Sequence, residues 1–294
     1  MSKISVIINT LNEDNNIEGS IKSVSWTDEI IVCDMYSQDK TVEIAKKAGA
    51  KVIFHKRETY VEPARNFAVL KASGDWILVI DADEQIPATL AERLQQIAAN
   101  MKQIDYVRIP RKNLIFGHFL RHSGWWPDYN IRFFKKDTVS WTNEIHRPPK
   151  AVGTGLDLEA EEKYAIIHHS YESISQFLER MNRYTTVEAN ELNKQGKKFI
   201  WKDLFVNPLN EFLSRFFALE GYKDGLHGLV LSLLQAFSFL VVSLKLWEIE
   251  KFRKQEITLE EVQSQNNESV RAINYWFKQS KSGGNFLSKL FKRR

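Results

Sequence analysis

The chain has 294 residues, of which 43% are hydrophobic and 27% are charged. These proportions exclude a disordered protein, and the length allows one large domain or two small ones. The single cysteine, Cys33, excludes an internal disulfide; its place in an apolar run predicts a core thiol in a reducing compartment. A strand pattern follows the first three residues directly, so no signal peptide is expected.

Charge is divided unevenly along the chain. Residues 1–100 carry 11 basic and 15 acidic side chains, whereas residues 101–294 carry 30 and 22. The stretch 278–294 has six basic residues and no acidic one. A basic end on a near-neutral protein predicts contact with an anionic surface. We expect a membrane surface and no nucleic acid, because the basic residues do not interleave with a nucleic-acid recognition motif.

The first hundred residues alternate between strand and helix patterns, which indicates βαβ units and a parallel sheet. Right-handed crossovers place the carboxyl ends of such strands along one edge, where ligands bind. No Gly-x-Gly-x-x-Gly follows the first strand, which argues against a nicotinamide or flavin enzyme. The predicted elements are strands at 4–8, 29–33, 51–54 and 76–80, alternating with helices that begin near 17, 41, 63 and 87.

Two aspartates, Asp81 and Asp83, follow the fourth predicted strand. Strand alternation through them would put both carboxylates on the same side, where they suit Mg²⁺ or Mn²⁺ that also holds phosphates. An isolated Asp-x-Asp is more often a pair of turn residues that cap the next helix. Polar side chains after the other strands favour a ligand site: Asn9, Thr10, Asn12, Glu13, Asp34, Ser37, Asp39, Arg65 and Asn66.

The pattern from 106 to about 147 is irregular and aromatic, with interspersed His, Asp and Arg, which is typical of a substrate-binding surface. Beyond Ser173 the chain is predicted to be helical, with breaks near Gly196, Pro208 and 225–228. We therefore expect one α/β domain at 1–172, with a ligand site at the strand ends of 1–100 and a substrate-binding, active-site region in 101–172. A helical, membrane-associating region is expected at 173–294.

Four segments, 5–13, 32–41, 64–66 and 74–84, resemble the family 2 glycosyltransferases with the GT-A fold. Residues 121–128 with 132–134 are similar to the branch of lipopolysaccharide core β-1,4-glucosyltransferases, as are 181–184 and 245–248. The resemblance implies an α/β GT-A fold: a Rossmann-like, mostly parallel sheet with helices on both faces, followed by a helical C-terminal region.

The resemblance also implies roles for the polar residues. Asp83, assisted by Asp81, would hold the divalent cation, and Arg65 would add positive charge near the phosphates, unless it is an ordinary salt-bridged helix residue. Many family members have a second acidic residue where this chain has Met35. Asp39 would then take the place of this missing acidic residue, or it would be a helix cap. The implied nucleotide-sugar residues are Thr10, Asn12, Glu13, Asp34, Asp39, Arg65, Asp81 and Trp126.

Inverting transfer needs a carboxylate that takes the proton of the acceptor hydroxyl. Asp128 and Glu144 are the candidates, with a slight preference for Asp128. His146 would complete the metal shell; it is followed by Arg147, where the branch usually has His-Glu in tandem. Trp126, with Trp125 beside it, would offer a flat face to a sugar ring, although aromatic core packing is an alternative.

Residues 226–247 are long enough to cross a bilayer, but polar residues interrupt them. Their apolar stripe favours a helix that lies in the membrane interface or packs on the catalytic domain. The last ten residues, 285–294, repeat a small apolar face surrounded by basic residues, which suits an anionic inner leaflet unless it is only a frayed end.

We expect a metal-dependent, inverting hexosyltransferase that moves a hexose, glucose by resemblance, from a UDP-sugar to a lipid-linked or lipopolysaccharide-type glycan. Alternatives are a polyprenyl-phosphate glycosyltransferase and a nucleotide-sugar-binding scaffold without turnover. The expected location is the cytoplasm, peripherally associated with the inner face of the plasma membrane.

Overall fold

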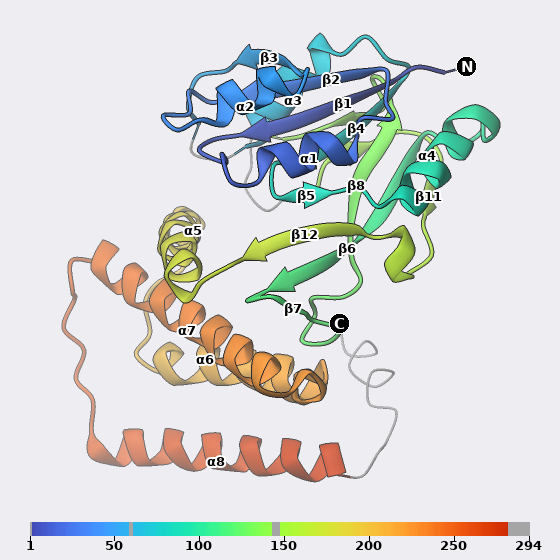
Figure 1. Cartoon of the computed structure of the whole chain (residues 1–294). Helices are drawn as coiled ribbons and strands as arrows, with labels where there is room; N and C mark the ends of the chain where they lie inside the picture. Colours follow the sequence, from blue (N-terminus) through green and yellow to red (C-terminus); the bar gives the residue numbers. More distant parts are fainter. Residues whose placement is uncertain (1, 59–60, 143–147, 282–294) are drawn as a thin grey trace. The chain divides into compact units, whose positions relative to one another are not determined.

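The computed structural model describes residues 2–58, 61–142 and 148–281, which form two compact units (Figure 1). The first unit comprises Met1–Leu114 and Pro127–Ser170. The second comprises Ile115–Trp126 and Tyr171–Arg294. The first unit thus ends two residues before the expected boundary at 172, and the segment 115–126, expected in the catalytic domain, belongs to the second unit.

The first hundred residues fold as the alternating pattern predicts. Four parallel strands pair in the order β3-β2-β1-β4. Their bounds are β1 Ile4–Thr10, β2 Glu29–Asp34, β3 Lys51–Phe54 and β4 Trp76–Asp81; the helices are α1 Ile17–Ser23, α2 Thr41–Lys47, α3 Glu62–Lys71 and α4 Ala88–Asn100.

The sheet continues with antiparallel strands, β8 against β4 and then β6 against β8. The expectation of an irregular segment over 106–147 was wrong here. Val107 and Ile109 are buried and alternate with the exposed Arg108, which is a strand period that the many aromatic and charged residues obscured. The remaining bounds are β5 Glu84–Gln85, β6 Tyr106–Ile115, β7 His118–Phe119, β8 Asp128–Lys135, β9 Val139–Ser140, β10 Lys150–Ala151, β11 Gly155–Asp157, η1 Glu162–Tyr164 and β12 Ile166–Tyr171.

Helices cover both faces of this sheet, as expected for a GT-A fold. On one face Val6 and Leu78 pack with α1 and with Leu94 of α4. On the other face Ile7 packs with Ala68 of α3. Cys33 is buried in this second layer, and burial, followed by the charge of the adjoining aspartate, raises its thiol pKa to about 12, which confirms a core thiol.

The second unit is helical after Ser173, as predicted. Ser173 accepts a hydrogen bond from the N–H of Gln176 and caps α5. The break expected at Pro208 is absent, because Pro208 lies inside α6, which continues to a π-helical turn. The bounds are α5 Ile174–Lys194, α6 Asp203–Leu213, η2 Ser214–Ala218, η3 Gly221–Asp224, α7 Gly225–Ile249 and α8 Leu259–Lys281.

Candidate active site

The carboxyl ends of β1 and β2 form the first part of the candidate site. Asn9, Thr10 and Asp34 are all buried there, and the strand register pairs Thr10 with Asp34. Asp34 accepts hydrogen bonds from the backbone N–H and the hydroxyl of Ser37, at 2.9 and 2.5 Å. Among the described residues, the Asn9 amide and the Thr10 hydroxyl have no hydrogen-bond partner. Buried polar atoms in this state indicate a place for a bound molecule or water.

Asn12 and Glu13 connect the loop after β1 to the loop after β2. Asn12 adopts a left-handed φ of 56°, donates its backbone N–H to the Ser37 hydroxyl at 2.8 Å, and accepts the Gln38 N–H at 2.8 Å. Glu13 donates its backbone N–H to the Thr41 hydroxyl at 2.8 Å. Both predicted nucleotide residues therefore also have a structural role, which is to fix the shape of the strand ends.

Asp39 makes an Asx turn just before α2, whose N-cap residue is Lys40. Its carboxylate accepts the backbone N–H and the hydroxyl of Thr41, the first residue of α2, at 3.0 and 2.5 Å. It also accepts the N–H of Asp14 at 3.2 Å. Burial alone would raise the Asp39 pKa, but these hydrogen bonds outweigh it and hold the pKa below its usual range. A contact of Asp39 with the nucleotide stays a prediction.

Asp81 is the last residue of β4, and Ala82 and Asp83 form a turn. The alternation expected to place both carboxylates on one side was therefore wrong, because the strand ends before Asp83. The Asp81 carboxylate accepts hydrogen bonds from Arg65 at 2.5 Å and Arg132 at 2.7 Å. Burial raises the Asp81 pKa, but the charges of Arg132 and Arg65 outweigh it and hold the pKa well below its usual range.

Charges of alternating sign continue from Asp81 across the sheet. Arg132 also donates to Glu84 at 3.0 Å, and Glu84 accepts Arg111 at 3.3 Å. Glu84 is fully buried, and its second oxygen accepts the backbone N–H of Asp81 at 2.9 Å. Arg111 in turn pairs with Asp128 at 2.5 Å. The network thus links the first aspartate of the Asp-x-Asp sequence to the preferred candidate for the catalytic base.

Asp128, the first residue of β8, keeps partial access to solvent, with 30% of its side chain exposed. Arg111 donates to it from two nitrogens, and Asn113 and Asn130 donate at 3.3 and 3.2 Å. Burial raises the Asp128 pKa, but the Arg111 charge and these hydrogen bonds outweigh it and hold the pKa below its usual range. Asp128 is therefore ionised at neutral pH, as a base must be, and its basicity is reduced.

Asp83 faces a histidine that the sequence analysis did not select. The Nε2 atom of His168, on β12, lies 3.7 Å from the Asp83 carboxylate. The other ring nitrogen, Nδ1, lies 2.6 Å from the side-chain oxygen of Asn113, and both His168 and Asn113 are buried. A hydrogen bond on Nδ1 fixes the ring and leaves Nε2 directed at Asp83, an arrangement common around metal-binding histidines.

The side chains present fit a divalent cation only if the bound nucleotide sugar contributes further ligands. Within residues 2–58, 61–142 and 148–281, no group of three His, Cys, Asp or Glu side chains is placed to hold a metal. Asp83 and His168 supply one carboxylate and one imidazole. Mg²⁺ and Mn²⁺ sites that act on phosphates normally combine one or two carboxylates with water and phosphate oxygens, so these two residues fit such a site.

Three predicted site residues are not placed with this group. Glu144 and His146 lie outside the described residues, so the roles predicted for them stay predictions. Trp126 belongs to the second unit, where its ring meets Phe119 edge to face at 5.3 Å between centroids. Aromatic packing, the alternative to sugar binding, is what these contacts show for Trp126.

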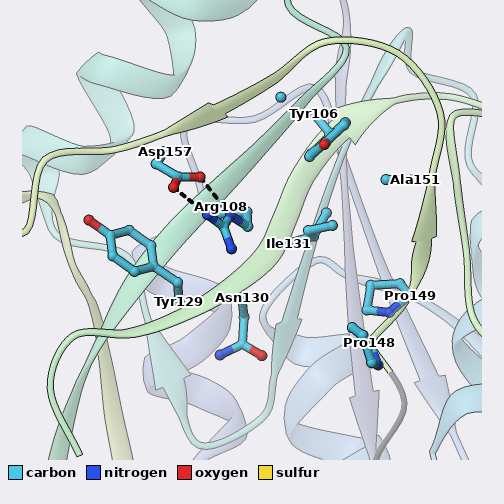
Figure 2. A pocket seen from close by; sticks show the side chains of 10 residues that line it. Tyr106, Arg108, Tyr129, Asn130, Ile131, Pro148, Pro149, Ala151 and Asp157 are labelled. Atoms are coloured by element: carbon cyan, nitrogen blue, oxygen red, sulfur yellow. Dashed lines mark hydrogen bonds and ion pairs between the residues drawn. The ribbon is translucent and has the colours of Figure 1, made fainter. Parts of the chain in front are cut away.

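A groove of about 760 Å³ lies on the first unit beside Asp128 (Figure 2). Asn130 lines the groove and donates to Asp128. Arg108 and Asp157 form a two-bonded ion pair in it, and the Tyr129 hydroxyl donates to a backbone oxygen, which fixes its ring. Tyrosine faces with planar polar groups can contact sugar rings and hydroxyls. The lining residues are Tyr106, Arg108, Tyr129, Asn130, Ile131, Pro148, Pro149, Ala151, Gly155 and Asp157.

Sequence reasoning missed several residues of this site. Arg132 stood in the branch-like segment without a role, and Glu84 directly follows the Asp-x-Asp sequence. The sequence indicated both residues by a charged side chain directly beside an apolar strand pattern. A charged residue buried in a sheet is expected to have a partner of opposite charge. For His168 the signal was polar residues that continue the apolar pair at 166–167. Asn113 and Arg111 gave none, because the strand β6 was not predicted.

Comparison with known proteins agrees with this fold. Residues 5–151 match the model of glycosyl transferase family 2. An uncharacterised glycosyltransferase of Rickettsia typhi is 35% identical over 258 residues, which cover 85% of this chain and 88% of the relative. The lipopolysaccharide core biosynthesis glycosyltransferase LpsC of Rhizobium meliloti is 23% identical, and the match covers 83% of this chain and 92% of LpsC.

Among solved structures, a glucosyl-3-phosphoglycerate synthase of Mycobacterium tuberculosis in complex with Mn²⁺, UDP and glucosyl-3-phosphoglycerate is 19% identical. The match covers 66% of this chain and 80% of that one with a TM-score of 0.42, which is too low to transfer any residue's role. The family match and the Rickettsia relative carry the assignment. The chain belongs to glycosyl transferase family 2, and it is a glycosyltransferase with a GT-A fold.

Proposed function

We propose that this enzyme is a metal-dependent, inverting hexosyltransferase that uses a UDP-sugar, with UDP-glucose favoured by the branch resemblance. The observation that carries the proposal is the end of β4. There Asp83 and His168 offer a carboxylate and an imidazole 3.7 Å apart, next to an Asp81 already paired with two arginines. A divalent cation held by Asp83 and His168 would act as a Lewis acid toward the departing diphosphate.

The nucleotide would bind at the ends of β1 and β2. The Asn9 amide and the Thr10 hydroxyl are buried and without partners among the described residues, so they can donate to and accept from a base or ribose. The Nε atoms of Arg65 and Arg132 are also buried without a partner there. These N–H donors beside Asp81 suit phosphate oxygens, which guanidinium groups bind well.

Asp128 would act as the base. The oxygen of an acceptor hydroxyl attacks the anomeric carbon, the bond from that carbon to the diphosphate oxygen breaks, and UDP leaves with the bonding electrons. The hydroxyl proton passes to the Asp128 carboxylate and then to solvent. The two asparagines and Arg111 hold the carboxylate in one orientation, and its partial exposure leaves a path for the acceptor.

The acceptor would be a lipid-linked or lipopolysaccharide-type glycan. The groove beside Asp128 supports a sugar acceptor, and the relative named for lipopolysaccharide core biosynthesis supports the class. Transfer to a polyprenyl phosphate is the second candidate. Its acceptor is already ionised, so it needs no base, and it predicts little effect of Asp128→Asn. A third possibility is a scaffold that binds the donor without turnover.

Release of UDP from a panel of UDP-sugars, with and without Mn²⁺, tests the proposal. We expect slow hydrolysis of one hexose donor, faster release when a glycan acceptor is added, and none after the metal is chelated. Binding of donors without any UDP release, with or without acceptor, would favour the scaffold. Equal release in a chelator would contradict the metal dependence.

A further inference from the structure

Helix α7 in the second unit turns its small and polar residues inward. Gly228, Ser232 and Ser243 are buried, and each serine hydroxyl donates to the backbone oxygen four residues earlier, at 2.7 and 3.2 Å. A side chain at Gly228 would collide with the backbone oxygen of Gly221, since a Cβ there would lie 1.9 Å from it. Small residues allow this close approach of backbones, as they do between helices in membranes.

The lysine within α7 also makes its contacts inside the unit. Lys245 donates its ammonium group to the backbone and side-chain oxygens of Asn182 at 2.5 and 2.7 Å, and to the Thr186 hydroxyl at 2.6 Å. Asn182 and Thr186 both belong to α5. Three of the polar residues that interrupt the apolar run of α7 therefore make their contacts within the unit, namely Ser232, Ser243 and Lys245.

A second set of large apolar residues of α7 faces the other way, whereas Leu231, Val242 and Leu246 are buried. Leu226, Leu233, Phe237 and Leu244 are 72%, 53%, 44% and 38% exposed. Their spacing of seven, four and seven residues puts them within about 20° of a single line along the helix, and the line is roughly 27 Å long at the ordinary helical rise. Because Leu231 and Leu246 are buried on the inner side, α7 is apolar on both sides, whereas a helix at a water-exposed surface normally has polar residues on its outer side.

We propose that this outer stripe of α7, defined by Leu226, Leu233, Phe237 and Leu244, lies in the interfacial layer of an anionic membrane. The helix segment Gly221–Ile249 has the length and a mean hydropathy of 2.0 that would also allow it to cross a bilayer. It lies along the surface instead, because its inner face is already packed against the rest of its own unit, with Lys245 bound to α5. A crossing helix would expose these polar contacts to lipid.

The charge around the stripe favours lipid over a second protein. Lys251, Arg253 and Lys254 follow α7 within five residues and are exposed. Farther along the sequence, the stretch 278–294 has six basic residues and no acidic one, and most of it lies outside the described residues. Apolar residues bordered by cations suit an interface of acyl chains and anionic headgroups, where each basic residue contributes roughly 1 kcal/mol.

Co-sedimentation of the full chain with vesicles tests the inference. We expect binding to vesicles of mixed phosphatidylglycerol and phosphatidylcholine, weakening as salt rises. The double variant Leu233→Ser/Phe237→Ser should bind at least tenfold more weakly. The matched control Leu70→Ser/Val152→Ser changes two apolar residues of the first unit that are more exposed, at 71% and 74%, than Leu233 and Phe237, and it should bind like the unchanged protein.

Two further measurements keep the result interpretable. Circular dichroism and UDP release from the donor should be unchanged in both double variants, which separates failure of this inference from failure of the proposed function. Light scattering reports the oligomeric state. The inference is overturned if the unchanged protein does not bind the vesicles, if the α7 double variant binds like the control, or if that variant only converts a dimer to a monomer.

Discussion

In the first unit, three carboxylates and three guanidinium groups meet at the carboxyl edge of the sheet, where a fold normally buries apolar side chains. In the second unit, α7 exposes leucines and phenylalanines on its outer side, although its inner side also buries Leu231, Val242 and Leu246. Both regions depart from the usual distribution of polarity, in opposite directions. Charged groups gathered inside a fold can bind a charged ligand, whereas apolar residues on the surface of a fold can contact an apolar phase.

The largest expected effect is that of replacing Asp83, which should strongly lower activity while the fold stays intact. We expect Asp83→Ala to lower transfer by about a hundred- to a thousandfold or more, because the cation that balances the departing diphosphate loses its carboxylate. Turnover at saturating donor and Mn²⁺ measures it, with Glu92→Ala on the exposed face of α4 as the control. Near-normal turnover of Asp83→Ala would show that the charged groups at this edge of the sheet serve another function than holding a catalytic cation.

Asp128→Asn should lower turnover by about a hundredfold while the KM for the donor changes little, as expected when a general base is lost. Steady-state kinetics with a glycan acceptor measure both constants. If Asp128→Asn is active and Glu144→Gln is inactive, the base is Glu144. If the amide oxygen of the new side chain takes the place of Oδ2, it can still accept from Asn113 and Arg111, and only the bond that Asn130 donates to Oδ1 is lost, so the fold should be retained.

His168→Ala should raise the Mn²⁺ concentration needed for half-maximal activity by roughly ten- to a hundredfold, a range typical for changes around a metal ligand. Asn113→Ala should have a smaller effect in the same direction, since it only frees the ring of His168. The variant His146→Ala, assayed in the same way, tests whether His146 is the nitrogen ligand instead of His168. A shift in His146→Ala alone would identify His146, and not His168 on β12, as the nitrogen ligand.

The smallest expected effect is on pH dependence. Arg111→Met removes the charge that lowers the Asp128 pKa, so the acid limb of the kcat profile should move to higher pH. The lowered pKa stabilises the fold above the unfolded-state pKa of an aspartate, and this contribution is lost as pH falls through the folded-state value. Arg111→Met should therefore also be less stable at neutral pH. Arg111→Lys should restore much of the profile, and an unmoved acid limb would exclude Asp128 as the titrating base.

The parallel half of the sheet could be predicted from sequence because each strand ends in a polar turn and each helix shows its own period. The carboxyl-edge residues Thr10, Asp34 and Asp81 followed from that alternation. The antiparallel half could not, since β6 interleaves charged residues such as Arg108 with its buried ones. Arg111 and Asn113 lie on that strand, and His168 reaches Asp83 through a pairing of β12 with β5 that no local pattern specifies.

The exposed apolar stripe of α7 was half visible in the sequence. The stripe of Leu226, Leu233, Phe237 and Leu244 could be read from its spacing, but its direction could not. Direction depends on which face packs on the neighbouring helices, and the bond from Lys245 to Asn182 across 63 residues decides it. The expected role of the last residues, 285–294, stays a prediction, because they lie outside the described residues.

Binding of Mn²⁺ in the presence of UDP, followed by electron paramagnetic resonance, tests the central claim most directly. We predict that the unchanged enzyme with UDP binds Mn²⁺ tightly, that Asp83→Ala loses this binding, and that Glu92→Ala keeps it. UDP should in turn bind more weakly when the metal is chelated, since the two ligands share the site. Equal Mn²⁺ binding by Asp83→Ala, or UDP binding that is indifferent to the metal, would contradict the account.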